Sequence, residues 1–254
     1  MSRARIARCT ILGALCVLSA LPAQAQPPTQ AQADARAASA PPVTPAPRSD
    51  SASIALLERA GKAYRGARTL RAAFTQELLN PRTRTNLRSA GEFFQQGTQR
   101  IAFKFSAPAE DRIVSDGQVL WLYSPSTAPG QVFKLPRAAG AGLDIAASVL
   151  TDPAKRYTVT AAGDTTLDGR AVRSMLLVPR TAAAPFMRAT LWIDTESALV
   201  RRAAFTEASG LVRTLTFTKI RTGSTLPRGV FTFTPPEGVR VIDQAAMLGG
   251  SVRP

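Results

Sequence analysis

Two different spacings of apolar residues alternate along the chain, and each predicts a different kind of secondary structure. After Ser53, the residues Ile54, Leu57, Ala60 and Tyr64 recur every three or four positions, which places them on one stripe of an amphipathic helix. Ser53 is the expected N-cap of this helix, because its hydroxyl can accept from the first free N–H groups. Helical spacing alone favours a stripe that packs on a core.

Farther along, the spacing of apolar residues falls to two, as expected for β-strands with one buried face. Residues 100–105 show it most clearly, because Ile101, Phe103 and Phe105 fall on one face and polar residues largely on the other. Residues 115–117 separate two apolar runs and predict a hairpin turn. Strands are also expected at residues 70–78, 91–96, 131–135, 157–161, 174–178, 189–193, 200–205, 211–220 and 230–236.

Residues 138–150 interrupt this strand pattern. If these residues form a helix, apolar side chains occupy nearly its whole circumference; they include Leu143, Ile145 and Val149. This pattern predicts a short helix buried on more than one face. Asp152 and Pro153 are expected to end it.

The expected strands, about ten or eleven in number, bound the possible architectures. An antiparallel sheet of that size with so few helices must curl, close or split into two layers. Either the sheet curves around the small helices and encloses an apolar pocket for a long apolar ligand, or two sheets meet around a solid core. Periodicity alone favours the solid core.

The first 25 residues have the layout of a secretory signal peptide. Three arginines precede the apolar run at residues 10–21, and the small residues Ala23 and Ala25 follow it, so cleavage is expected after Ala25. The run is too short to cross a bilayer, which takes about 20 residues. Cys9 and Cys16 leave with the signal, so no disulfide is expected in the mature protein.

Composition divides the rest of the chain into three parts. Residues 26–50 are rich in Pro, Ala and Gln and are expected to form a disordered linker, since they cannot bury enough apolar surface to offset their ordering entropy. Residues 51–243 have a length that suits one domain with a sizeable core. Residues 244–254 form a C-terminal tail.

The chain is strongly basic, with a formal net charge of +15, or about +12 once the three signal arginines are removed. Its cations are scattered singly, without a dense run or interleaved stacking aromatics, which argues against a nucleic-acid partner. A cationic surface in the cell envelope would meet anionic lipid headgroups or acidic proteins. Codon usage in a GC-rich genome explains the arginines equally well.

The chain contains no histidine, which removes Ser-His-Asp triads and His-based zinc sites. Phosphate-binding and dinucleotide-binding glycine motifs are also absent from the sequence. Paired carboxylates remain as candidate acids and bases, but turn chemistry explains them better; they are Glu110 with Asp111, Asp164 with Asp168, and Asp194 with Glu196. We therefore expect no catalytic residues, no metal and no cofactor, and a protein that is not an enzyme.

Several short motifs occur in the order found in one known family. They are Phe74–Gln76, Gly91–Phe94, Val114–Gly117 followed by Leu120 and Trp121, Leu191–Asp194, and the closing run Phe231–Gly238. Together, over about Ser51 to Asp243, they make the chain resemble the LolA family of periplasmic outer-membrane lipoprotein carrier proteins.

The resemblance implies a mainly β fold with two or three small helices. It would be an incomplete antiparallel β-barrel of about ten or eleven strands with a helical lid over an apolar cavity. The cavity would shelter the acyl chains of lipoproteins crossing the periplasm. The residues matched to its lining are Phe94, Ile101, Phe103 and Phe105 on strands and Leu57, Tyr64, Leu143, Ile145 and Val149 on the lid. The alternative for each of these side chains is that it belongs to an ordinary hydrophobic core and lines no cavity.

The resemblance also implies partners. A soluble monomer would receive acylated lipoproteins from an inner-membrane ABC transporter of the LolCDE type and deliver them to an outer-membrane receptor of the LolB type. The alternatives are a LolA-like fold that binds another amphiphile, such as a glycolipid, and one that acts as an envelope-stress sensor.

The sequence departs from the family at the end of the second strand. There the family often has an Arg-Pro pair whose arginine helps to hold the lid shut, whereas this chain has Gln96, Gly97 and Thr98. Arg100 is the possible substitute for that lid latch.

Overall fold

The computed structural model describes residues 49–136, 145, 149–182 and 184–244. All of them belong to the second of two compact units, Ala46–Pro254. The expected signal peptide, nearly all of the expected linker, most of the helix expected at residues 138–150 and the C-terminal tail after residue 244 lie outside the described residues. Their boundaries stay predictions.

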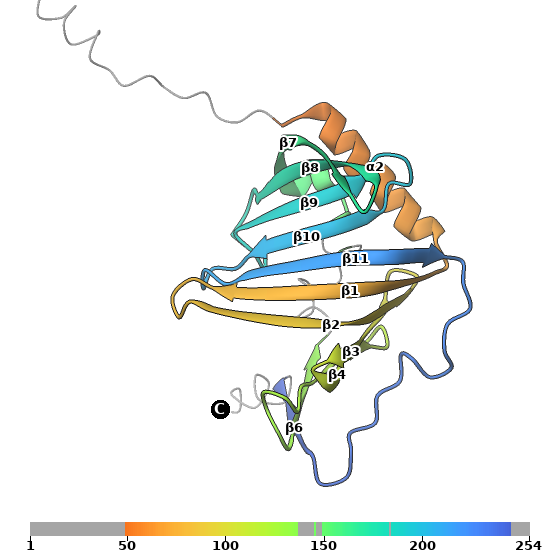
Figure 1. Cartoon of the computed structure of the whole chain (residues 1–254), viewed down its shortest axis with the longest axis vertical. Helices are drawn as coiled ribbons and strands as arrows, with labels where there is room; N and C mark the ends of the chain where they lie inside the picture. The colour runs from red at the N-terminus through yellow and green to blue at the C-terminus, as the bar shows by residue number, and fades with distance from the viewer. Residues whose placement is uncertain (1–48, 137–144, 146–148, 183, 245–254) are drawn as a thin grey trace, which may run out of the picture. The chain divides into compact units, whose positions relative to one another are not determined.

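One twelve-stranded sheet contains all the strands of the described residues (Figure 1). In the sheet, the strands follow the order β12-β6-β5-β4-β3-β2-β1-β11-β10-β9-β8-β7. They are β1 (Thr69–Asn80), β2 (Thr85–Gln96), β3 (Arg100–Ala107), β4 (Ala109–Ser115), β5 (Val119–Tyr123), β6 (Gln131–Pro136), β7 (Tyr157–Leu167), β8 (Arg170–Pro179), β9 (Arg188–Asp194), β10 (Val200–Thr206), β11 (Val212–Thr222) and β12 (Arg240–Asp243).

The sheet is open, because its two edge strands, β7 and β12, are not paired with each other. Neighbouring strands are antiparallel except for β12, which runs parallel to β6. The expectation of a mainly β, incomplete barrel is confirmed, and the expected hairpin at residues 115–117 joins β4 to β5. The strand count is one or two higher than expected.

The strand expected at residues 230–236 is absent, since this segment pairs with no strand of the described sheet. Its apolar side chains instead pack on the face of the sheet that carries Phe94, and Phe233 lies 5.6 Å from the rings of Trp121 and Tyr123. Pro235 and Pro236 have no N–H to donate to a ladder, which explains why this alternating run does not extend the sheet. The last strand is β12 instead.

Curvature enters the sheet at irregular positions in several ladders. The register shifts between Ala90 and Gly91 in β2, opposite β3, and similar shifts occur in β1, β7 and β10. Gly91 is required there, because a Cβ at this position would lie 2.1 Å from the Lys104 carbonyl oxygen. The bulge lets β2 and β3 approach while the sheet bends.

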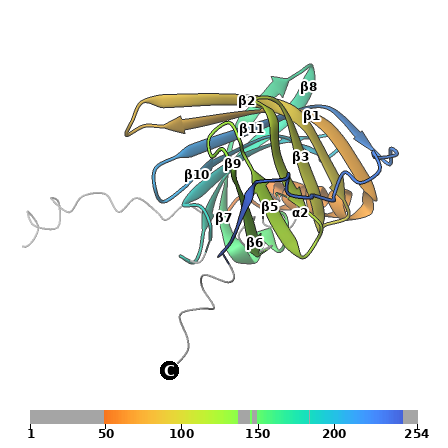
Figure 2. The same cartoon turned by 90° about the horizontal axis from the view of Figure 1, so that it is seen from below.

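Helix α2 (Ser51–Gly66) lies on the concave side of the sheet and packs against β7, β9 and the short helix α4 (Pro153–Arg156) (Figures 1 and 2). Its N-cap is Asp50, whose carboxylate accepts from the N–H of Ser53 at 2.9 Å. The expectation that Ser53 is the cap is wrong: Ser53 is the third residue of the helix and is fully buried. Asp50 caps more effectively because it lies directly before the helix.

The buried stripe of α2 contains a glycine that lies close to the backbone of a neighbouring segment. A Cβ on Gly61 would lie 2.7 Å from the carbonyl oxygen of Leu150. Leu57, Ala60 and Tyr64, the neighbours on that stripe, are buried as expected. Gly61 therefore allows the helix to pack tightly on the segment around Leu150.

Substitution of Gly61 by alanine is expected to destabilise the protein. Alanine favours a helix over glycine by about 1 kcal/mol, but displacing the Leu150 backbone costs roughly 1–3 kcal/mol. Gly66→Ala is the matched control, since nothing lies within 4 Å of its added Cβ, and we expect it to be neutral or slightly stabilising. Denaturant unfolding compares the two variants, and equal stabilisation by both would contradict the close approach.

Candidate functional site

The concave face of the sheet holds one large apolar cluster. Strands from both halves of the sheet contribute to it, and α2 covers it. The structure brings together seven of the nine residues expected to line a cavity: Leu57, Tyr64, Ile101, Phe103, Phe105, Ile145 and Val149. Leu143 lies outside the described residues.

Aromatic rings form the centre of this cluster. The ring of Phe74 on β1 lies 5.1 Å from the rings of both Phe103 and Phe105 in edge-to-face contact. Phe93 on β2 lies 4.7 Å from Phe103 and 5.3 Å from Phe217. These offset and edge contacts are the favourable geometries for aromatic pairs. The rings pack mainly on one another along four neighbouring strands.

Where Tyr64 of α2 meets the sheet, the described side chains pack closely. A cavity of about 10 Å³ remains, lined by Tyr64, Leu70, Ala72, Phe93, Gln95, Ile145, Phe217 and Ile220. That volume is about enough for a single water molecule. This cavity, as the described residues line it, has no room for an alkyl chain, so an apolar ligand entering there has to displace α2 or the segment around Ile145.

Phe94 does not belong to the concave cluster. Phe93 pairs with Phe103 on β3, whereas Phe94 pairs with Ala102, and successive residues of a strand point to opposite faces. Phe94 therefore lies on the other face with Ala102 and Val114. The sequence offers two adjacent phenylalanines, and only the register of β2 with β3 shows which of them faces the helix.

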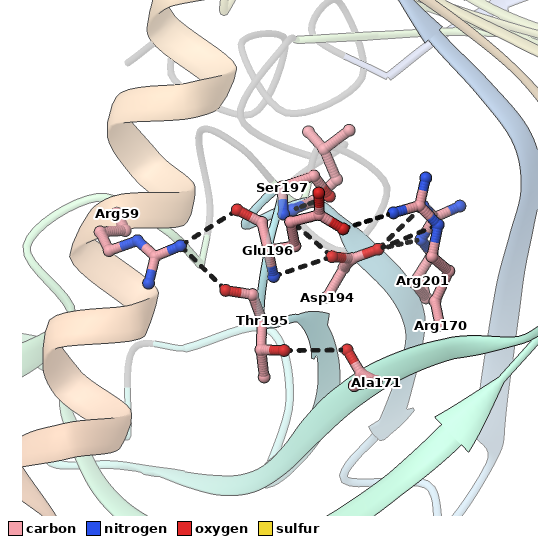
Figure 3. A network of polar contacts seen from close by, with 9 residues as sticks. Arg59, Arg170, Ala171, Asp194, Thr195, Glu196, Ser197 and Arg201 are labelled. Carbon is pink, nitrogen blue, oxygen red and sulfur yellow. Dashed lines mark hydrogen bonds and ion pairs between the residues drawn. The ribbon is translucent and has the colours of Figure 1, made fainter.

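On its exposed side, α2 is joined to the sheet by Arg59. Its guanidinium donates to the carbonyl oxygens of Thr195 and Glu196, at 3.0 and 3.2 Å, in the turn between β9 and β10 (Figure 3). Thr195 in turn donates from its N–H and hydroxyl to the Ala171 carbonyl at the start of β8. The turn is thus a fixed acceptor for the helix. Sequence reasoning missed Arg59, because its partners are backbone atoms about 136 positions away.

Asp194 shapes this turn from within. Its side chain is 1% exposed, and it accepts from the N–H groups of Glu196 and Ser197 at 3.0 and 2.9 Å. Arg201 donates to the same carboxylate at 2.9 Å (Figure 3). Burial raises the pKa of Asp194, but the Ser197 N–H, the Arg201 guanidinium and the Glu196 N–H together outweigh it, so the pKa lies below its ordinary value.

A sequence profile described as "Outer membrane lipoprotein carrier protein LolA" matches residues 65–234, which span the concave strands and the β9–β10 turn. The chain belongs to the LolA family. An outer-membrane lipoprotein carrier protein of Methylibium petroleiphilum is 31% identical to it over 179 residues, 70% of this chain and 84% of the relative.

A second carrier protein of this name, from Methylococcus capsulatus, is 27% identical over 177 residues and covers 70% of this chain and 82% of its own length. Among solved structures, a LolA superfamily protein from Nitrosomonas europaea is 15% identical, with a TM-score of 0.39. That match covers 70% of this chain and 96% of the solved one.

Arg100, the candidate latch of this LolA-family chain, hydrogen-bonds within the sheet. It donates to the carbonyl oxygen of Asp116 at 3.2 Å and to the side chain of Gln96 at 3.3 Å. Both partners lie at the end of the sheet where the β4–β5 turn is found, and neither belongs to α2. A contact with residues 137–144 falls outside the described residues, so the latch role stays a prediction.

The convex face of the sheet carries a larger groove, which the sequence did not indicate. About 680 Å³ of space lies between β2–β5 and residues 227–236. Its lining mixes the apolar residues Phe94, Val114, Val230 and Phe233 with the charged residues Glu92, Lys104, Glu110, Arg112 and Arg228. The mixture of charges distinguishes this groove from the dry concave cluster.

Four of the six carboxylates considered as candidate acids and bases have structural partners: Asp111, Asp164, Asp194 and Glu196. Asp164 pairs with Arg173 at 2.9 Å, and Asp111, which lies within β4 and not in a turn, accepts from the Ser126 hydroxyl at 2.7 Å. Within the described ranges, no group of His, Cys, Asp and Glu side chains is placed to hold a metal ion. The same ranges contain no helix long and apolar enough to cross a membrane.

Asp194→Asn is expected to lower the free energy of unfolding at neutral pH by roughly 2–4 kcal/mol, because Arg201 loses its charged partner in a buried turn. A lowered pKa contributes stability above the ordinary aspartate pKa of about 3.9 and loses it as the pH falls through the folded-state value. The difference between wild type and variant should therefore shrink below about pH 4.

Denaturant unfolding at neutral and acid pH measures this difference. The control is Asp168→Asn, since Asp168 lies in an exposed turn at a positive φ of 53° that asparagine also accepts. A wild-type advantage over Asp194→Asn that stays constant down to acid pH would contradict the role of the charge.

Proposed function

We propose that this protein is a periplasmic carrier that shelters the acyl chains of lipoproteins, and that α2 moves aside to admit them. The observation that carries the proposal is the continuous apolar concave face closed by a separate helix. The helix can leave without breaking any strand pairing, because its contacts with the sheet are made by side chains and by the turns at its ends. Membership in the LolA family supports this interpretation.

In such a carrier, the apolar concave face exchanges its contact with α2 for contact with the acyl chains of the cargo. Each buried methylene of an acyl chain contributes about 0.8 kcal/mol, so free chains in water are strongly disfavoured. Admission of cargo exposes Leu56, Leu57, Ala60 and Tyr64 of α2, which now cover the concave face. The free energy lost by exposing these side chains offsets part of the free energy gained by burying the cargo. Binding therefore stays reversible enough for delivery. No covalent bond needs to change.

The family also supports a route for the cargo. We propose that the chain is exported with its signal peptide, cleaved near Ala25, and acts as a monomer. It would accept lipoproteins from an ABC transporter of the LolCDE type and pass them to a receptor of the LolB type. Two relatives that are named outer-membrane lipoprotein carrier proteins, 31% and 27% identical, support carriage of outer-membrane lipoproteins.

Release of lipoproteins from inner-membrane vesicles tests the carrier function directly. The exported protein is expected to carry away a triacylated lipoprotein and to leave behind the same polypeptide without acyl chains. Mass spectrometry of the lipids retained after purification identifies the cargo. Recovery of a glycolipid with no lipoprotein, or equal release of acylated and unacylated polypeptide, would refute the proposal.

Loss of the α2 anchor is expected to speed ligand entry. Arg59→Ala removes two hydrogen bonds from a charged donor without touching the apolar cluster. We expect uptake of a fluorescent fatty acid to accelerate about fivefold, as a loss of about 1 kcal/mol from the closed state implies. Stopped-flow fluorescence measures the rate. Lys62→Ala, an exposed cation on the same helix, is the control, and equal rates in both variants would exclude Arg59 as an anchor.

A further inference from the structure

The large apolar side chains that the described residues expose lie at one end of the sheet. They are Leu79, Leu87, Val178, Met187 and Val241, with Leu87 58% and Met187 63% exposed. This is the end at which β1 and β8 finish and β2, β9 and β12 begin. Single exposed apolar residues are common on protein surfaces, and here all five lie at the same end of the strands.

The hairpin of β1 and β2 projects beyond its neighbours at this end (Figure 2). Pairing of β2 with β3 stops at Ala90, so residues 85–89 have no strand on that side in the described sheet. Every residue from Pro81 to Arg88 is exposed. Leu79 lies opposite Asn86 and Leu87 opposite Leu78, which places the two exposed leucines on opposite faces of the hairpin.

The tip of this hairpin is positively charged. Arg82 and Arg84 lie in the turn, and neither guanidinium forms an ion pair within the described residues. Arg88 pairs with Glu77 at 3.0 Å, and Glu207 in the neighbouring β10–β11 turn pairs with Arg213 at 3.5 Å. The nearby carboxylates are therefore used, and the charges of Arg82 and Arg84 remain for an external anion.

We propose that the β1–β2 hairpin docks the protein on the surface of an anionic lipid bilayer. Arg82 and Arg84 would meet lipid phosphates, while Leu79 and Leu87, on the two faces of the hairpin, enter the boundary between headgroups and acyl chains. Cations beside exposed apolar side chains are the combination that binds such surfaces. Addition of a peptide strand to the free edge of β2 is less favoured, because Arg84 and Arg88 flank that edge, and charged side chains discourage edge pairing.

Sedimentation with vesicles tests the proposal without any lipoprotein present, so its outcome is independent of the carrier function. The protein is expressed from the full-length gene and mixed with vesicles of phosphatidylcholine alone or of equal parts phosphatidylcholine and phosphatidylglycerol. We expect binding to the anionic vesicles only. Arg82→Glu with Arg84→Glu should reduce it about tenfold or more, and Leu79→Ser with Leu87→Ser should also reduce it.

The matched control reverses two arginines at the opposite end of the same strands. Arg68→Glu with Arg221→Glu makes the same change of charge beside the start of β1 and the end of β11, where both side chains are exposed. Thermal melting verifies that all variants are folded. Reduced binding in the hairpin variants alone supports the proposal. Equal loss in the control, which indicates general charge attraction, or undiminished binding in the hairpin variants, overturns it.

Discussion

The whole fold depends on the burial of one concave apolar face. A sheet of twelve strands that neither closes on itself nor stacks on a second sheet presents that face to water unless something else covers it. Helix α2 provides the cover with Leu56, Leu57, Ala60 and Tyr64. Ile145, Val149 and Leu150 add to this cover, and the curvature introduced at Gly91 and the other irregular positions deepens the face that they protect. Protection is therefore divided between the curved sheet and the segments that cover it.

The described contacts that hold α2 against the sheet are few and weak compared with the hydrogen bonds between neighbouring strands. Gly61 allows close packing on Leu150, Asp50 joins the start of the helix to β7 through a 2.8 Å hydrogen bond to Val159, and Arg59 reaches the β9–β10 turn. The turn itself is held from within, since the buried Asp194 beneath it pairs with Arg201. A fixed acceptor of this kind fits the proposed carrier, in which α2 opens and returns to the same place.

The two faces of the sheet have different tasks because strand residues alternate. On the concave side, Phe93 and Phe103 pack under the helix, while on the convex side Phe94 and Ala102 lie beneath residues 226–233. The convex groove is larger and carries both charges, so it suits polar contact and not storage of an acyl chain. Basic residues are scattered along the sequence. In the structure, two of them, Arg82 and Arg84, lie at the tip of the β1–β2 hairpin without acidic partners in the described part of the chain.

Periodicity along the sequence determined most of the strands, the helix at the start of the domain, and the common face of Ile101, Phe103 and Phe105, because a period of two fixes which residues share a face. The alternating run at residues 230–236 is the exception, since it forms no strand. The ordered motifs also pointed correctly to the LolA family. Turn chemistry in the sequence likewise identified Asp194 and the hairpin at residues 115–117 as structural.

Tertiary structure alone decided the rest. The choice between Phe93 and Phe94 depends on the register of β2 with β3, which period-two spacing leaves open. The small size of the cavity beside Tyr64 depends on how the side chains of α2 meet rings from the sheet. Arg59 binds backbone oxygens, which every residue possesses, so no residue type in the turn could reveal it. Strand register, the volume filled by packed side chains and the positions of backbone acceptors all depend on how distant segments come together in the fold. The pattern of residues along the sequence specifies none of them.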